Sequence, residues 1–390
     1  MRRPAASPLL TLLFACLLGT AHAQQTASDR SQLRISLLTC SPGAELYSTF
    51  GHSALRIVDT AAGTDIVYNF GVFDFSDPDF YVKFIRGKLL YFLDQEAFPY
   101  FQYAYLVEGR RISEQVLRLD ADRKREIQAF LAENLRPENR YYKYDFLFDN
   151  CTTRLRDLIL RQGSPAVRTG RVLDDTTTTF REQLHSYLYP NRQYWSALGI
   201  DILLGSRIDR PMTNEQAMFL PDFLEKALDS SRDTGGSLVE GKAVILESTA
   251  GTDTDQPWLP PTVLAFSVAL GLIVLLSFMR TKSAVSILKA TDRFLFLVTG
   301  AIGVLLVFMW TGTDHASCRD NLNLAWALPT HLAAAFRLRS GTRAVNTYLR
   351  ATAGLSAALL AGWAFLPQDL NPALLPIVLW MGWRAYRLSA

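Results

Sequence analysis

Apolar residues are distributed unevenly along this chain of 390 residues. Up to about residue 250 they alternate with polar residues over short segments, as they do in a soluble domain. Beyond residue 257 they gather into five stretches dense in Leu, Ala, Val, Phe and Trp, near 258–279, 294–311, 322–336, 346–366 and 372–385. The third and fifth stretches are short for a membrane span. The group as a whole predicts an all-α transmembrane bundle of about five helices.

The first part of the chain predicts a mixture of strands and helices. Residues 52–59 and 65–75 have the composition of two strands, and the turn between them predicts a hairpin. Further strands are expected at 32–39 and within 99–119, and helices at 121–134, from 151 to about 161 and over most of 176–230. Asp201, Asp209 and Asp222 are expected to cap helices. The pattern therefore predicts an α+β domain.

Two other segments have compositions of their own. Residues 1–23 combine a basic start, an apolar run and a small-residue cleavage site, which predicts a secretory signal peptide. Residues 231–257 are rich in Gly, Ser, Thr and Asp, which predicts a tether. The expected organisation is a signal peptide at 1–23, an exported domain at 24–230, a tether at 231–257 and a bundle at 258–390.

The charge pattern orients the bundle in a membrane. The loops after the first, third and fifth apolar stretches carry Arg or Lys, whereas the loops after the second and fourth carry only Arg319 between them. Because positive charge marks the cytoplasmic side, the exported domain and the loop at 312–321 are expected to face outward together. The net charge of +3 gives no indication of nucleic-acid binding.

Cysteine usage indicates a free thiol. Cys16 leaves with the signal peptide, so Cys40, Cys151 and Cys318 remain in an oxidising compartment. An odd number leaves at least one thiol unpaired, and catalysis is one reason to keep it. Spacing does not decide whether Cys40 and Cys318 form a disulfide.

Two motifs about a hundred residues apart suggest where such a thiol reacts. Residues 50–57 (Phe-Gly-His-Ser-Ala-Leu-Arg-Ile) place His52 after a glycine at the start of a strand. Residues 149–153 (Asp-Asn-Cys-Thr-Thr) place Cys151 at the start of a helix that Asn150 is expected to cap. A helix start lowers the pKa of a thiol, and a histidine can take its proton. The two motifs therefore predict a Cys/His acyl-transfer site, and no metal-ligand spacing is present.

The order of these motifs resembles that of the circularly permuted papain-like thiol enzymes, in which a strand histidine precedes an Asn-Cys pair. Longer blocks resemble the Lnb-type lipoprotein N-acyltransferases over nearly the whole mature chain, at 38–56, 67–75, 149–154, 199–205, 219–222, 313–315 and 321–324. The resemblance implies a permuted papain-like thiol-enzyme domain fused to several transmembrane helices. It also implies a multi-pass protein of the bacterial inner membrane with its catalytic domain in the periplasm.

The same resemblance implies a two-step acyl transfer without a cofactor. Cys151 would take a fatty acyl chain from a membrane phospholipid as a thioester. The α-amine of a diacylglyceryl-modified lipoprotein cysteine would then attack that thioester. His52 would act as the base, and the Cys151 backbone N–H would be one oxyanion donor.

Several further residues are candidates for this site. Asn69 is expected to orient His52 through its amide carbonyl, with Tyr68 or Asp74 as alternatives. The candidate substrate-binding residues are Tyr68, Arg56, Asn150 and His315. Arg56 is expected to meet a phospholipid head group, and His315 lies on the outward loop.

Two other functions fit the same residues. An exported cysteine hydrolase of cell-wall peptides or lipid esters would use the same chemistry, but a soluble wall substrate needs no fused bundle. A non-catalytic membrane receptor or scaffold would simply bury Cys151, and would leave it unreactive towards thiol probes.

Overall fold

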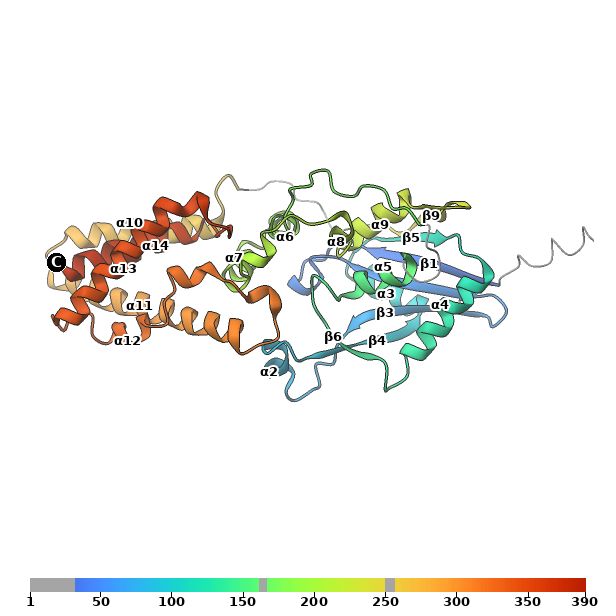
Figure 1. Ribbon diagram of the computed structural model, residues 1–390, viewed down its shortest axis with the longest axis horizontal. Coiled ribbons are helices and arrows are strands. Elements are labelled where there is room, and N and C mark those ends of the chain that lie inside the picture. Colours follow the sequence, from blue (N-terminus) through green and yellow to red (C-terminus); the bar gives the residue numbers. More distant parts are fainter. Residues whose placement is uncertain (1–31, 161–166, 250–256) are drawn as a thin grey trace, which may run out of the picture.

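The computed structural model describes residues 32–160, 167–249 and 257–390 (Figure 1). They form a mixed α/β domain up to residue 249 and a helical bundle from residue 257 onward. The expected signal peptide and residues 250–256 of the expected tether lie outside the described residues.

The centre of the first domain is an antiparallel sheet. Within the described residues its seven strands lie in the order β6-β4-β3-β2-β1-β5-β9. They are β1 (Leu33–Cys40), β2 (His52–Asp59), β3 (Thr64–Val72), β4 (Leu90–Ala97), β5 (Ile112–Leu117), β6 (Tyr141–Lys143) and β9 (Val239–Leu246). The predicted hairpin is confirmed, with Leu55 of β2 opposite Tyr68 of β3.

Helices cover both faces of this sheet. They are α3 (Phe98–Val107), α4 (Ala121–Asn134), α5 (Cys151–Leu160) and α9 (Pro221–Ser230). α4, α5 and α9 pack on the face that carries Leu37, Leu55 and Phe70, and form the main apolar core there. α3 packs on the opposite face, over Ala54 and Val67. Because side chains alternate along a strand, β2 and β3 contribute to both cores.

α3 corrects the prediction of strands across 99–119. Phe98, Phe101 and Tyr105 recur at helical spacing and cover the second face of the sheet. Pro99 stands in the first turn of α3, where a missing N–H costs no helical hydrogen bond. Strand structure in this segment is confined to β5.

β9 corrects the prediction of a tether over 231–257. β7 (Arg232–Asp233) and β8 (Gly236–Ser237) form a small hairpin, and β9 then pairs with β5 at the edge of the sheet. The run from Ala243 to Leu246 is apolar and partly β-branched, which suits a strand better than a flexible linker. The first domain therefore extends well past residue 230.

The other helices of this domain are α2 (Phe80–Ile85), α6 (Phe180–Leu188), α7 (Tyr194–Leu203) and α8 (Asn214–Ala217). Figure 1 shows α2, α6 and α7 between the sheet and the bundle. Trp195 of α7 packs against Phe266 in the first helix of the bundle, with ring centroids 5.8 Å apart. The first domain and the bundle are therefore in direct contact.

The bundle contains α10 (Pro261–Phe278), α11 (Lys282–Thr311), α12 (His331–Ala335), α13 (Arg343–Gly362) and α14 (Leu374–Ser389). Of the described helices, α10 and α11 are long and apolar enough to cross a membrane, with a mean hydropathy of 2.3 in each. α14 packs against both α13 and α10.

The apolar stretch predicted at 322–336 does not form a continuous helix. It consists of η4 (Leu322–Ala325) and the short α12, separated by a turn that contains Pro329. The segment lies close against α11, since Cβ atoms added at Gly300 and Gly303 would lie 2.4 and 2.1 Å from its backbone. Irregular backbone is stable at membrane depth only where protein surrounds it, and α11 provides this cover.

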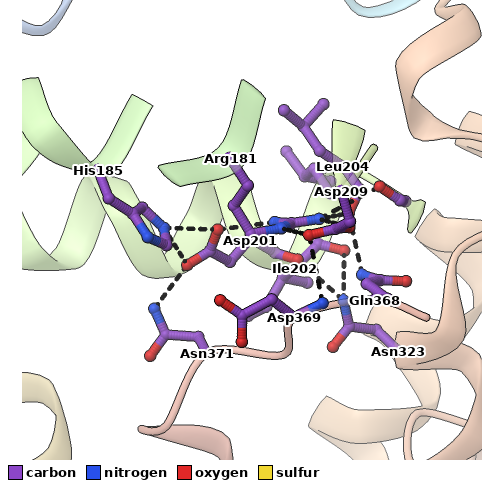
Figure 2. A network of polar contacts seen from close by, with 12 residues as sticks. Arg181, His185, Asp201, Ile202, Leu204, Asp209, Asn323, Gln368, Asp369 and Asn371 are labelled. Carbon is purple, nitrogen blue, oxygen red and sulfur yellow. Dashed lines mark hydrogen bonds and ion pairs between the residues drawn. The ribbon is translucent and has the colours of Figure 1, made fainter. Parts of the chain in front are cut away.

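A buried polar network joins the first domain to the bundle (Figure 2). Arg181 of α6 contacts Asp201 and Asp209, each at 2.7 Å. His185 Nε2 bonds the Asp201 carboxylate at 2.9 Å, and Asn371 from the segment before α14 donates to it at 2.7 Å. The prediction that Asp201 caps a helix is wrong, because it lies inside α7 with its carboxylate fully buried.

Main-chain contacts strengthen this junction. The Gly205 N–H donates to the Ser317 carbonyl at 2.9 Å, and the Ser206 N–H donates to the Asp320 carbonyl at 3.1 Å. A Cβ added at Gly205 would lie 1.9 Å from the Arg319 carbonyl oxygen, so only glycine permits the approach. The loop at 312–321 therefore lies with the first domain at one end of the bundle, and that this end faces outward stays a prediction.

Candidate active site

Cys151 is the first residue of α5, and its position is fixed by the residue before it. The Asn150 side-chain carbonyl accepts from the Thr153 N–H at 2.8 Å, and the Thr153 hydroxyl accepts from the Asn150 N–H at 2.8 Å. This reciprocal pair confirms that Asn150 caps the helix. The N–H groups of Cys151 and Thr152, at the first two positions of α5, have no helical carbonyl before them, so they can stabilise negative charge at Cys151.

His52 begins β2, where a glycine brings the chain unusually close to its neighbours. Gly51 has a φ of +77°, and a Cβ there would lie 2.7 Å from the Cys40 carbonyl oxygen and 3.4 Å from Pro221. A side chain at this position would therefore be strained and would clash. Gly51 is what lets His52 enter the strand opposite Cys40 at the end of the sheet.

The thiol of Cys151 and the imidazole of His52 interact electrostatically, and each shifts the pKa of the other. Burial opposes ionisation of Cys151, but the charge and hydrogen bond of His52 outweigh it, with help from the Ser53 N–H and the Thr152 hydroxyl. The net effect lowers the pKa of Cys151 to about 7. Burial likewise opposes protonation of His52, but Cys151 and Asn69 raise its pKa. The two shifts together favour a thiolate–imidazolium pair near neutral pH.

Asn69 holds the other side of the His52 ring, and Glu96 holds Asn69. His52 Nε2 lies 3.1 Å from Asn69 Oδ1, and Asn69 Nδ2 donates to Glu96 Oε1 at 3.1 Å. A carboxylate only accepts, so the amide nitrogen of Asn69 must face Glu96 and its carbonyl must face His52. His52 therefore carries its proton on Nε2, and Nδ1 is left as the base for the thiol.

The contact to Asn69 matches the first choice of orienting residue, and neither alternative occupies that place. Asp74 is exposed and bonds the Ser76 N–H at 2.8 Å. Glu96 was missed by sequence reasoning, because its role depends on β4 lying beside β3 in the sheet. Burial raises the pKa of Glu96, and Asn69 and His52 partly offset this effect.

The remaining wall of the site is aromatic. A Cβ added at Gly71 would lie 3.6 Å from the Cys151 Cβ and 3.6 Å from the Tyr144 ring, so Gly71 keeps space between them. Tyr144 stacks on Tyr91 with centroids 4.2 Å apart. Burial raises the pKa of both tyrosines, which therefore stay neutral at the pH where the thiol ionises.

Two residues predicted to contact substrate are used inside the domain. The Arg56 guanidinium is buried, bonds Asp65 at 2.7 and 2.6 Å and Glu114 at 3.2 Å, and lies over the Phe98 ring. The Asn150 amide nitrogen donates to two backbone carbonyls at 2.8 and 2.9 Å. Because their polar groups have protein partners, the structure gives both residues positioning roles in place of the predicted substrate contacts.

Tyr68 and His315 lie apart from the thiol–imidazole pair. Strand alternation places Tyr68 on the face opposite Asn69, against the main core, where burial raises its pKa. His315 Nε2 lies 3.0 Å from the Phe84 carbonyl oxygen, at the contact between the outward loop and α2. The structure therefore brings together His52, Asn69 and Cys151 but leaves these two residues outside the group.

The other two cysteines differ from Cys151. Cys40 and Cys318 are both free and buried, so they do not form the disulfide that spacing had left open. Burial raises the pKa of Cys40 to about 12 and that of Cys318 to about 11. Among the described cysteines, Cys151 is the one whose pKa is lowered.

No three His, Cys, Asp or Glu side chains in the described part of the chain converge in a way that could hold a metal ion. Comparison with protein families gives two matches. Residues 20–186 match the Lnb N-terminal periplasmic domain, and residues 253–389 match the Lnb transmembrane domain. No curated protein and no solved structure matches the chain.

Proposed function

Because the chain belongs to the Lnb-type family, whose members pair a periplasmic domain with a transmembrane domain, we propose that it is a thiol-dependent lipoprotein N-acyltransferase of the bacterial inner membrane. The donor is a membrane phospholipid, and the acceptor is the α-amine of a diacylglyceryl-modified lipoprotein cysteine. The observation that supports this proposal best is the Cys151–His52–Asn69–Glu96 group, with the pKa of its thiol lowered to about 7.

In the first step the donor ester is exchanged for a thioester. His52 Nδ1 takes the thiol proton, and the Cys151 thiolate attacks the ester carbonyl. Negative charge develops on the carbonyl oxygen, and the Cys151 backbone N–H would be one donor that stabilises it. The C–O bond then breaks, and His52 returns the proton to the departing hydroxyl of the lysophospholipid.

In the second step the thioester is exchanged for an amide. The lipoprotein amine attacks the thioester carbonyl, and His52 takes a proton from the attacking nitrogen. The C–S bond breaks, and the Cys151 thiolate is regenerated beside the imidazolium. A pKa near 7 suits both steps, because the sulfur must be a nucleophile in the first and a leaving group in the second.

The attachment to the bundle favours this proposal over a hydrolase of soluble substrates. Both the donor and the acceptor are held in the bilayer by acyl chains, and each methylene moved into water costs about 0.8 kcal/mol. The catalytic domain contacts the bundle through α7 and through the loop at 312–321. An enzyme that acts on bilayer lipids needs its thiol near the membrane, whereas a hydrolase of soluble peptides does not.

Mass spectrometry of lipoprotein N-termini tests the proposal. In a strain that lacks other N-acyltransferases, expression of this chain is expected to add one acyl chain to the α-amine of lipoprotein cysteines, and the Cys151→Ala variant is not. A hydroxylamine-sensitive acyl group on Cys151 is expected with phospholipid vesicles alone. Free α-amines in the presence of active, membrane-inserted protein would contradict the proposal, and release of free fatty acid instead would favour the hydrolase.

A further inference from the structure

Exposed apolar side chains gather on α2 and the segments beside it. They are Phe75, Tyr81, Val82, Phe84, Ile85 and Leu90, with exposed fractions from 46% at Ile85 to 74% at Tyr81. We call this set the α2 patch. Rings of Phe75, Tyr81 and Phe84 all contact the buried ring of Phe80, so the patch is continuous. A large exposed apolar patch on a folded domain marks an interaction surface.

The α2 patch lies at the outer end of a candidate membrane span. α11 ends at Thr311, and the loop that follows it contacts α2 directly. The Asp314 N–H donates to the Arg86 carbonyl at 3.0 Å, and the His315 ring bonds the Phe84 carbonyl at 3.0 Å. Figure 1 shows α2 beside this end of α11. With α11 spanning the membrane, the patch would lie at the membrane interface, where aromatic side chains are favoured.

A row of aromatic rings leads from the α2 patch to the thiol. Successive centroid distances are 5.3 Å for Tyr81 and Phe80, 5.8 Å for Phe80 and Phe73, 5.3 Å for Phe73 and Tyr91, and 4.2 Å for Tyr91 and Tyr144. Tyr144 then borders Cys151 across Gly71. A continuous row of packed aromatic rings thus connects the exposed α2 patch to the wall of the site beside Cys151.

We propose that the α2 patch and this row of rings bind the fatty acyl chain that is transferred, with its carbonyl at Cys151 and its tail directed back to the bilayer. The inference rests on the proposed function and names the surface that its donor uses. Apolar rings suit an acyl chain, because each methylene that they cover is removed from water. A protein partner on the same patch is the competing outcome.

Photocrosslinking tests the binding without requiring transfer. The full chain carrying Cys151→Ser is placed in vesicles of phosphatidylethanolamine and phosphatidylglycerol with a trace of phospholipid bearing a photoreactive acyl chain. We expect labels on peptides from residues 73–91 in addition to those on the bundle, and none above background at Tyr100 of α3. Labels confined to the bundle, or equal labelling at Tyr100, would overturn the inference.

A matched pair of double variants tests the effect of the α2 patch on the reaction. Tyr81→Ser/Phe84→Ser removes two rings of the α2 patch, and Tyr100→Ser/Tyr103→Ser removes two exposed rings of α3. Tyr81 and Tyr100 are both 74% exposed, but Tyr100 follows the end of β4 that lies away from Cys151. The first variant is expected to form acyl-Cys151 from vesicle phospholipid roughly tenfold more slowly, and the second at the parent rate.

A short-chain soluble thioester separates binding from chemistry. Both variants are expected to react with it at the parent rate, since it does not reach the α2 patch. An undiminished rate of the α2 variant on phospholipid would overturn the inference, as would an equal loss on both substrates. If the parent protein forms no acyl-Cys151 from phospholipid, the proposed function fails. The crosslinking result still tests, independently of transfer, whether an acyl chain binds to the α2 patch.

Discussion

Two clusters in this molecule pair a histidine with buried polar groups, and they serve different purposes. At the junction, His185 and Arg181 share the carboxylate of Asp201, which is fully buried. At the end of the sheet, His52 bonds an amide on one side and a half-buried thiol on the other. The junction cluster contains more charged side chains than the cluster at the end of the sheet, and these side chains are more deeply buried. It nevertheless offers no nucleophile, so its ion pairs hold helices together.

The comparison indicates which feature marks a reactive site. A histidine held by a polar side chain occurs in both clusters, so this pairing alone has no functional meaning. The difference is Cys151, which stands at a helix start, interacts with His52 and has a lowered pKa. Chemistry therefore depends on the nucleophile and its environment, while a charged network without one contributes to architecture.

Replacing the nucleophile is expected to have the largest effect. Cys151→Ser should lower acyl transfer by roughly 10³-fold or more, because the serine hydroxyl stays protonated where the thiol ionises. The rate of acyl-enzyme formation on vesicles measures it, with Cys318→Ser as the control because Cys318 is also free but has a raised pKa. Comparable losses of rate in the two variants would contradict the assignment of Cys151, and not Cys318, as the nucleophile.

Replacing each histidine in turn tests whether the two clusters have different roles. His52→Ala should lower the rate roughly 10²- to 10⁴-fold, the usual range for loss of a general base, with little change in thermal unfolding. His185→Ala should instead lower the unfolding temperature and leave the rate on a soluble short-chain thioester near the parent value. If His185→Ala abolished that rate in folded protein, the junction would have to be regarded as part of the catalytic machinery.

Removing the central charge of the junction is expected to destabilise the protein. Asp201→Asn leaves the buried Arg181 with one carboxylate fewer, which should cost roughly 3 kcal/mol. Asp320→Asn is the matched control, since Asp320 and Arg207 form an exposed ion pair at the same junction and such pairs contribute at most about 1 kcal/mol. Thermal unfolding in detergent measures both. Equal shifts would mean that burial does not distinguish the two pairs.

The ionisation of Cys151 predicts a specific pH dependence. Its pKa is lowered to about 7, so the thiolate fraction falls about tenfold per unit as pH decreases below that value. The rate of alkylation by iodoacetamide should rise with pH through this range and level off above pH 8. Cys40 and Cys318 should remain unlabelled in folded protein, because burial raises the pKa of both. A midpoint near 9 for Cys151 would mean that His52 does not activate it.

The smallest effect is expected at Glu96. In Glu96→Gln the new amide can donate to Asn69 as well as accept from it, so the orientation of Asn69 is no longer fixed. We expect a loss of about fivefold, with the acid limb of the pH–rate profile shifted because the imidazolium loses a nearby negative charge. Glu138→Gln, an exposed carboxylate outside the sheet, serves as the control. Wild-type behaviour in both would reduce Glu96 to a structural residue.

Local sequence signals predicted the parts of the molecule that depend on local structure. His52 after a glycine, Cys151 after a capping Asn150, and the hairpin that presents Asn69 could all be inferred from short segments. Glu96 could not, because a neighbour in the sheet is known only once the strand order is known. The same limit applies to Arg56, whose partners Asp65 and Glu114 come from two other strands.

Predictions from composition were wrong where the same residues suit two kinds of secondary structure. The aromatic segment of α3 favours strand by residue type, but its helical spacing covers the second face of the sheet. The Gly- and Ser-rich start of the predicted tether concealed β9. The third apolar stretch lacks a continuous helix because Pro329 interrupts it and α11 packs on its backbone.

The main-chain contacts at Gly205 have a consequence for the proposed acyl transfer. Hydrogen bonds from Gly205 and Ser206 to the loop after α11 fix the catalytic domain to the bundle by backbone atoms, which cannot change rotamer. The fold would then fix the height of the thiol above the bilayer. In the proposed reaction selectivity would then be positional, because the thiol would attack the carbonyl that a lipid presents at that height. A substitution at Gly205 would change which bond is within reach without altering any residue that performs the chemistry.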